Sequence, residues 1–156
     1  MNMEKYMREA LALAREAMEA GEIPVGCVVV DGEGRVIGRG RNRREERRSV
    51  CGHAEIEALE DAARCRGDWR MDDCALFVSL EPCPMCAGAM IMSRLGTLVY
   101  GAREEHTGSA ASILNLFEEN YPGHTAIYGG VLAEESAGLL REFFEKMRGT
   151  GGLAGG

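Results

Sequence analysis

Apolar residues recur along the first part of the chain with two different periods. Over residues 2–20 they stand at spacings of three and four, which predicts an amphipathic helix that ends at Gly21. Residues 25–31 form a short apolar run that predicts a buried strand. Glycines 32 and 34 predict a turn into a second strand over residues 35–40, so we expect these two strands to form a hairpin.

The rest of the chain alternates between helical and strand patterns. The predicted elements are a helix over 53–66, a strand over 74–80, a helix over 84–94, strands over 97–101 and 125–131, and a closing helix over 134–148. The helix over 84–94 is apolar on nearly every side and is therefore predicted to be buried. The alternation predicts a three-layer α/β/α domain with a mixed sheet, in which the hairpin is antiparallel and the later strands are parallel.

Length and composition place these elements in one domain. A chain of 156 residues with 46% hydrophobic residues can bury a substantial core. We expect this domain to cover residues 1–148, and the glycine-rich residues 149–156 to form a flexible tail. No stretch approaches the roughly 20 apolar residues of a membrane span, and nothing resembles a signal peptide. With six cysteines and no export signal, we expect a cytoplasmic protein with reduced thiols and no membrane segment.

Two short motifs combine ligand types that zinc prefers. His53-Ala54-Glu55 supplies an imidazole and a carboxylate, and residues 82–86 supply the two cysteines of a C-x-x-C pattern. Catalytic zinc sites use three protein ligands and leave a fourth position for water. We therefore predict one Zn²⁺ per chain, held by His53, Cys83 and Cys86.

The same residues can meet at one metal only if two helices begin there. Side chains two positions apart in a helix point to opposite sides, so His53 and Glu55 can share a site only at a helix start. Pro84 suits the first turn of a helix, which places Cys83 at its cap. A helix N-terminus favours the thiolate form of cysteine. The pattern H-x-E…P-C-x-x-C resembles the signature of zinc nucleobase deaminases, in which Glu55 would carry protons between water, a ring nitrogen and departing ammonia.

Three other interpretations of the cysteines and histidines are open. The C-x-x-C could be a redox motif, although such proteins need no paired His-x-Glu. A structural zinc would need a fourth ligand, for which Cys51 is the only close candidate. His106 and His124 are expected at the surface. The other three cysteines are predicted to be small buried hydrophobic residues: Cys27, Cys65 and Cys74.

The charge distribution bears on possible partners. A net charge of −7 is unlike that of a protein coated in nucleic acid. Between residues 35 and 48, however, seven arginines stand with only two acids. This arginine cluster is either a solvated surface loop or a patch that attracts phosphate groups beside the site.

Several stretches together resemble the bacterial tRNA-specific adenosine deaminases. These are residues 22–26, 41–43, 53–56, the run LEPCPMCAGAMIMSR over 80–94, 101–103, 107–108 and 139–144. The resemblance covers roughly residues 4–148. It implies a homodimer with a five-stranded cytidine-deaminase-like fold, which deaminates adenosine to inosine at the wobble position of a tRNA anticodon. A dimer also agrees with the helix over 84–94, which is apolar on more sides than one small sheet can cover.

The resemblance also implies substrate contacts. Asn42 would bond the flipped adenine, Val25 would wall the pocket, and the loop over 103–108 would contact the RNA together with Phe143 and Phe144. The residues carried over as substrate-binding are Val25, Asn42, Ala54, Glu104 and Phe144.

The chain departs from the family pattern only on segments that face substrate. Residues 49–52 read Ser-Val-Cys-Gly where the family usually has Asp-Pro-Thr-Ala. Glu104 and His106 stand where Asp and Lys are usual, and the closing helix lacks the usual basic extension. Two alternatives therefore stay open beside the tRNA deaminase. One is a zinc deaminase of a small base or nucleoside such as guanine or cytosine, and the other is a non-catalytic, metal-stabilised RNA-binding module.

Overall fold

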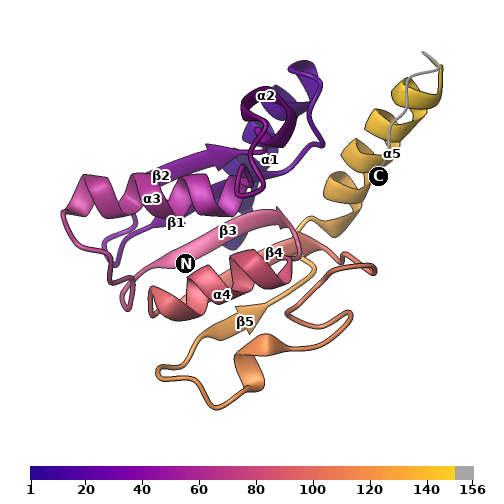
Figure 1. The fold of residues 1–156 in the computed structure, drawn as a ribbon. Coiled ribbons are helices and arrows are strands. Elements are labelled where there is room, and N and C mark those ends of the chain that lie inside the picture. The colour runs from indigo at the N-terminus through magenta and orange to yellow at the C-terminus, as the bar shows by residue number, and fades with distance from the viewer. Residues whose placement is uncertain (150–156) are drawn as a thin grey trace.

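A computed structural model describes residues 1–149 as one five-stranded sheet with helices on both of its faces (Figure 1). The elements in chain order are α1 (Met3–Glu19), β1 (Gly26–Val30), β2 (Val36–Arg41), α2 (Arg44–Arg47), α3 (Ala54–Arg66), β3 (Ala75–Leu80), α4 (Pro84–Met92), β4 (Thr97–Ala102), a 3-10 helix η1 (Leu116–Glu118), β5 (Ala126–Tyr128) and α5 (Ala133–Gly149). The predicted helices and strands are all present, although β5 is shorter than expected. The short elements α2 and η1 were not predicted.

The sheet is mixed, as the alternation of elements predicts. Its strand order is β2-β1-β3-β4-β5. The hairpin strand β1 pairs antiparallel with both β2 and β3, whereas β3, β4 and β5 are mutually parallel. The parallel strands β3 and β4 both end at the same edge of the sheet. The loops that follow them therefore lie side by side.

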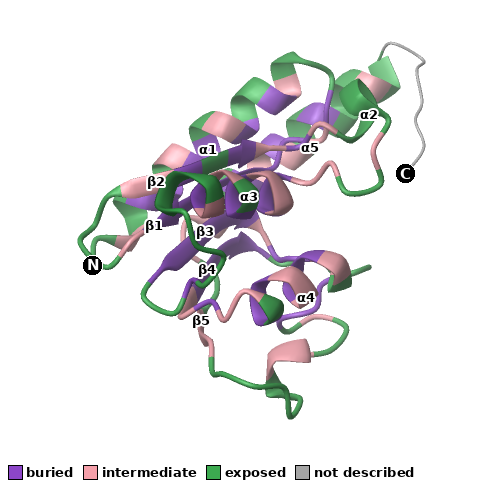
Figure 2. Cartoon of the chain, turned by 60° about the vertical axis from the view of Figure 1, so that its left-hand side comes forward, coloured by how far each residue is buried: buried purple, intermediate pink, exposed green. Residues whose placement is uncertain are grey.

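Helices α1 and α5 cover one face of the sheet, and α3 and α4 cover the other. Met7 of α1 and Leu139 of α5 pack with strand residues such as Phe77 in one apolar cluster. Ala58 of α3 and Met90 of α4 belong to a second cluster on the opposite face. Figure 2 shows the buried strands between these two helical layers. The predicted α/β/α arrangement is confirmed.

Close packing against β2 fixes the position of α3. A Cβ on Gly38 would lie 2.3 Å from the carbonyl oxygen of Ala58, and one on Gly40 would lie 2.3 Å from that of Ala54. Real side chains do not approach so closely, so only glycine lets the helix backbone rest directly on this strand. The first turn of α3 is therefore held at a defined height above the sheet.

The prediction that the helix over 84–94 is buried was wrong for the single chain. The inward side of α4 is buried at Cys86, Ala87 and Met90, but Met92 is 65% exposed. The reason is that the sheet can cover only one side of this helix. Two further apolar residues, Ile113 and Leu114, are also exposed.

In the described part of the chain, no helix combines the length and apolar character that a bilayer crossing requires. Gly149 ends α5, and the rest of the predicted tail, 150–156, lies outside the described residues.

Candidate active site

The N-termini of α3 and α4 bring the three predicted metal ligands together. His53 is the N-cap residue of α3, and Cys83 is the N-cap residue of α4, with Cys86 in its first turn. Their ligand atoms all lie within 4.8 Å of one another. The His53 Nδ1 atom is 3.6 Å from the Cys83 sulfur and 3.5 Å from the Cys86 sulfur. The helix starts inferred from the motifs are therefore present.

These separations match those of a tetrahedral zinc site. With Zn–S bonds of about 2.3 Å and Zn–N bonds of about 2.0 Å, tetrahedral angles require the sulfur and nitrogen ligands to be about 3.5 Å apart. The observed separations of 3.5 and 3.6 Å agree with that value. The donor set and its spacing thus fit zinc.

The electrostatics of the three residues also favour a cation. The pKa of Cys83 is lowered to about 4, first because the Cys86 thiol bonds to its sulfur and also because His53 does. The same Cys83 contact raises the pKa of His53. The pKa of Cys86 is raised by its bond to Cys83 and by burial. The protein therefore holds a thiolate beside an imidazole, and a divalent cation can be bound where these groups would otherwise share protons.

Glu55 lies in the first turn of α3 beside this cluster. Its side chain is only 4% exposed. Burial raises the pKa of this carboxyl to about 7, against smaller opposing effects from a backbone hydrogen bond and from His53. A group with a pKa near neutrality can both take up and release a proton at physiological pH. Burial thus makes Glu55 suited to the proton transfer that the sequence pattern predicts.

A cavity of about 730 Å³ opens onto Glu55, His53 and Cys83. Its volume is within the usual range for small-molecule sites. All five residues predicted to bind substrate line it: Val25, Asn42, Ala54, Glu104 and Phe144. Phe143, in contrast, is buried and packs edge-on against Phe144. The structure brings the predicted residues together, and their individual roles remain predictions.

Comparisons with known proteins bear on what this arrangement does. The sequence matches the MafB19-like deaminase family over residues 1–148. It is 41% identical over 146 residues to the tRNA-specific adenosine deaminase of Bacillus subtilis (strain 168), covering 93% of this chain and 90% of that relative. The chain belongs to the tRNA-specific adenosine deaminase family. Over 142 residues it is also 44% identical to the tRNA(Ile)-lysidine synthase of Deinococcus radiodurans, covering 91% of this chain but only 24% of that relative.

Solved structures of deaminases with different substrates resemble this chain. A structure from studies of A-to-I editing by tRNA:A34 deaminases at the wobble position of transfer RNA has a TM-score of 0.83 and 38% identity, covering 87% of this chain and 99% of that one. A guanine deaminase from Nitrosomonas europaea has a TM-score of 0.79 and 28% identity, covering 90% of this chain and 83% of that one. The cytidine-deaminase-like fold expected from the resemblance is confirmed.

The side-chain amide of Asn42 makes two hydrogen bonds within the protein and keeps further hydrogen-bonding capacity for a ligand. The residue is 7% exposed. Its Nδ2 donates to the Ile23 carbonyl at 3.4 Å, and its Oδ1 accepts from the Arg44 N–H at 3.0 Å. An asparagine amide has two N–H donors and two lone pairs, so one of each remains for a bound base.

Two buried glutamates, to which no sequence pattern assigned a role, support the loops around the cavity. Glu22 is 2% exposed and accepts from the backbone N–H groups of Glu45 and Glu46, at 3.1 and 2.6 Å. Glu81, also 2% exposed, binds the loop that follows β4. Each acid stands next to an apolar run, which is the signal that could have singled it out.

The arginine cluster is largely neutralised by ion pairs within the chain. Arg35 pairs with Asp31 and Glu33, Arg39 with Glu9, Arg41 with Glu46, Arg43 with Glu46 and Glu57, and Arg47 with Glu57. Among residues 1–149, no ion pair involves Arg44 or Arg48, and Arg44 lines the cavity. Most of the cluster is therefore surface structure, and Arg44 is the member placed to meet a substrate.

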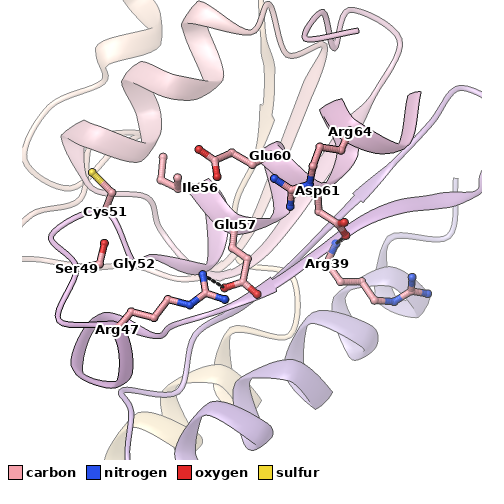
Figure 3. A pocket seen from close by; sticks show the side chains of 10 residues that line it. All are labelled: Arg39, Arg47, Ser49, Cys51, Gly52, Ile56, Glu57, Glu60, Asp61 and Arg64. Atoms are coloured by element: carbon pink, nitrogen blue, oxygen red, sulfur yellow. Dashed lines mark hydrogen bonds and ion pairs between the residues drawn. The ribbon is translucent and has the colours of Figure 1, made fainter. Parts of the chain in front are cut away.

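Cys51 faces a different hollow from the metal ligands. A hollow of about 400 Å³ on the outer side of α3 is lined by Cys51 together with Ser49, Ile56 and charged residues such as the ion-paired Arg47 and Glu57 (Figure 3). The group of possible metal ligands found among residues 1–149 does not include Cys51. Cys27 and Cys74 are buried as predicted. The prediction for Cys65 was wrong, because the end of α3 leaves it exposed.

Proposed function

We propose that this protein is a zinc-dependent hydrolytic deaminase that converts adenosine to inosine at the wobble position of a tRNA anticodon. One observation carries the proposal: two members of the His53, Cys83 and Cys86 cluster, His53 and Cys83, line the same cavity as the buried Glu55. The relatives named as tRNA-specific adenosine deaminases, which match nearly the whole chain, support the same substrate. A tRNA substrate also fits the cytoplasmic location expected from the sequence.

The chain's own residues suit this reaction. One zinc per chain, held by His53, Cys83 and Cys86, would supply Lewis-acid activation of water. Glu55 takes up the proton that water loses on attack at C6 of adenine and delivers it to the ring nitrogen. Glu55 then takes the proton of the new hydroxyl on C6 and delivers it to the departing ammonia, so both protons of the water are accounted for. Burial of Glu55 keeps bulk water from competing for that proton.

The cavity walls suit a base taken out of a nucleic-acid stack. Ile23, Val25 and Leu80 supply apolar surface, and Asn42 supplies a donor and an acceptor for the base edge. Phe144, 43% exposed on α5, offers a ring for stacking a neighbouring nucleotide. Arg44 and Arg103 at the same cavity can neutralise phosphates.

The second candidate is deamination of a free nucleobase. The similarity to the guanine deaminase from Nitrosomonas europaea favours it. Glu104 and Glu105 at the cavity favour it as well, since acidic residues there do not attract phosphate. A free base carries no phosphate and would need only the inner part of the cavity.

We expect the purified protein to form inosine in a tRNA anticodon stem-loop with adenosine at the wobble position. Sequencing detects inosine as guanosine, and a stem-loop with guanosine at that position is the matched control. A parallel assay follows ammonia release from free adenine, guanine and cytosine. Robust ammonia release from a free base, with no inosine in any tRNA tested, would replace our first choice by the second.

We also propose a homodimer built on the outer side of α4. This side leaves Met92 exposed, and neighbouring loops expose Ile113 and Leu114. Met92→Glu should shift the protein to monomers in sedimentation velocity at micromolar concentration, because burying an unpaired charge costs several kcal/mol. Val50→Glu is the matched control, since Val50 is 82% exposed on a different surface. A wild-type protein that sediments as a monomer at all concentrations contradicts the proposal.

A further inference from the structure

The loop over residues 103–112 forms one wall of the cavity. Residues 103–107 all line it. Arg103, Glu105, His106 and Thr107 are exposed, so this stretch makes few apolar contacts that could order it. Loops with little buried surface are usually the least stable parts of a fold. Something else must therefore hold this wall in place.

Glu81 supplies the missing anchor. One carboxylate oxygen accepts from the N–H groups of Ala110, Ala111 and Ser112, at 3.1, 2.8 and 2.8 Å. The other oxygen accepts from the Glu104 N–H at 3.1 Å and from the Ser112 hydroxyl. A single buried side chain thus joins both ends of the loop to the end of β3.

The carboxylate has no capacity left for chemistry. Five donors share its two oxygens, and the side chain is 2% exposed although it borders the cavity. Its fit is tight, since a Cβ on Gly108 would lie 2.4 Å from the Glu81 carboxyl carbon and 2.3 Å from the Glu104 carbonyl oxygen. Glu81 therefore differs from Glu55, which carries no comparable set of backbone donors.

We infer that Glu81 is a positioning residue that sets the loop over 103–112 in advance to receive the substrate. This inference rests on the proposed function. Through the loop, Glu81 orders Glu104 and its neighbours before a nucleic acid arrives, and so lowers the entropic cost of binding. Its removal should weaken substrate binding while the proton transfer by Glu55 continues.

Glu81→Gln tests the inference, because the Gln side-chain amide group would face backbone N–H donors where the carboxylate accepted their bonds. On the anticodon stem-loop we expect KM to rise by about tenfold or more, on the scale of lost charge-assisted hydrogen bonds. We expect kcat to stay within about threefold, and zinc content to remain at one per chain. Hydrogen exchange of amides 104–112 should speed up, while that of β1 should not.

Two further variants make the result specific. Gly108→Ala displaces the same carboxylate without changing any charge, and it should reproduce the rise in KM and the faster loop exchange. Asp31→Asn is the matched control, because Asp31 also accepts from two backbone N–H groups, those of Glu33 and Arg35, in a turn away from the cavity. It should leave KM for the stem-loop unchanged.

The outcomes separate this inference from the proposed function. Unchanged loop exchange in Glu81→Gln overturns the inference whatever the substrate is, since that measurement needs none. Faster exchange with an unchanged KM overturns it as well, and a fall in kcat alone would make Glu81 part of the chemistry. Failure of the wild-type protein to form inosine refutes the proposed function instead, and the KM comparison then moves to the base that is deaminated.

Discussion

Replacing Glu55 with Gln is expected to lower turnover by at least about 10²-fold, the usual scale for a lost general acid–base group. Gln keeps the shape of the side chain but cannot take up a proton. Because Glu55 is not in the ligand cluster, zinc content should stay at one per chain. Turnover on the stem-loop and metal analysis of the same sample measure both quantities.

Glu57→Gln is the matched control for this prediction. Glu57 stands two residues further along α3, where it pairs with Arg43 and Arg47 and does not line the cavity. We expect its turnover to stay within about threefold of the wild type, because Glu57 lies outside the cavity and a partly exposed ion pair contributes little to stability. Near-normal turnover in Glu55→Gln, with zinc retained, would mean that another group carries the proton.

Replacing Cys86 with Ala is expected to remove zinc and activity together. Cys86 is fully buried in the first turn of α4, and no other side chain of the described residues joins its group of possible ligands. Loss of an outer-shell partner alone usually costs 10–100-fold in metal affinity or activity, so loss of a direct ligand should lower turnover by more than about 10²-fold. Metal analysis after dialysis and the inosine assay check both effects.

Replacing Cys51 with Ala distinguishes a catalytic zinc site with three protein ligands from a structural zinc site with Cys51 as the fourth ligand. Cys51 faces the outer hollow, so its removal should leave zinc and turnover unchanged. Loss of zinc in Cys51→Ala would indicate a closed four-ligand site, and full zinc retention in Cys86→Ala would refute the assigned ligands.

The meeting of the three candidate metal ligands was predictable because the signals for it are local in the sequence. Side chains two residues apart within a helix point to opposite sides, so His53 and Glu55 can share a site only where a helix begins. Pro84 likewise marks the start of α4. The strands were predictable for a similar reason, since short apolar runs bounded by glycine and charge mark them one at a time. The structure confirms these helix starts and the mixed sheet.

Features that depend on distant neighbours were not predictable in the same way. Glu22 and Glu81 bind backbone groups more than twenty residues away, and no periodic pattern indicates such partners. The apolar character of α4 predicted burial, but it could not indicate that Met92 lies beyond the reach of this chain's own sheet. Likewise, a run of arginines in the sequence does not indicate which acidic residues of other elements form ion pairs with it.

Around the cavity, the residues expected to carry out the reaction and those expected to bind the substrate stand on different elements, which affects how this enzyme family can diversify. The groups expected to do the chemistry stand on the first turns of α3 and α4, whereas Asn42, Glu104 and Phe144 stand on two loops and on α5. Mutations can therefore exchange one substrate for another while the reaction machinery remains intact. Selection for a new base, in nature or in the laboratory, should concentrate its changes on those loops and on α5, leaving the two helix starts almost untouched.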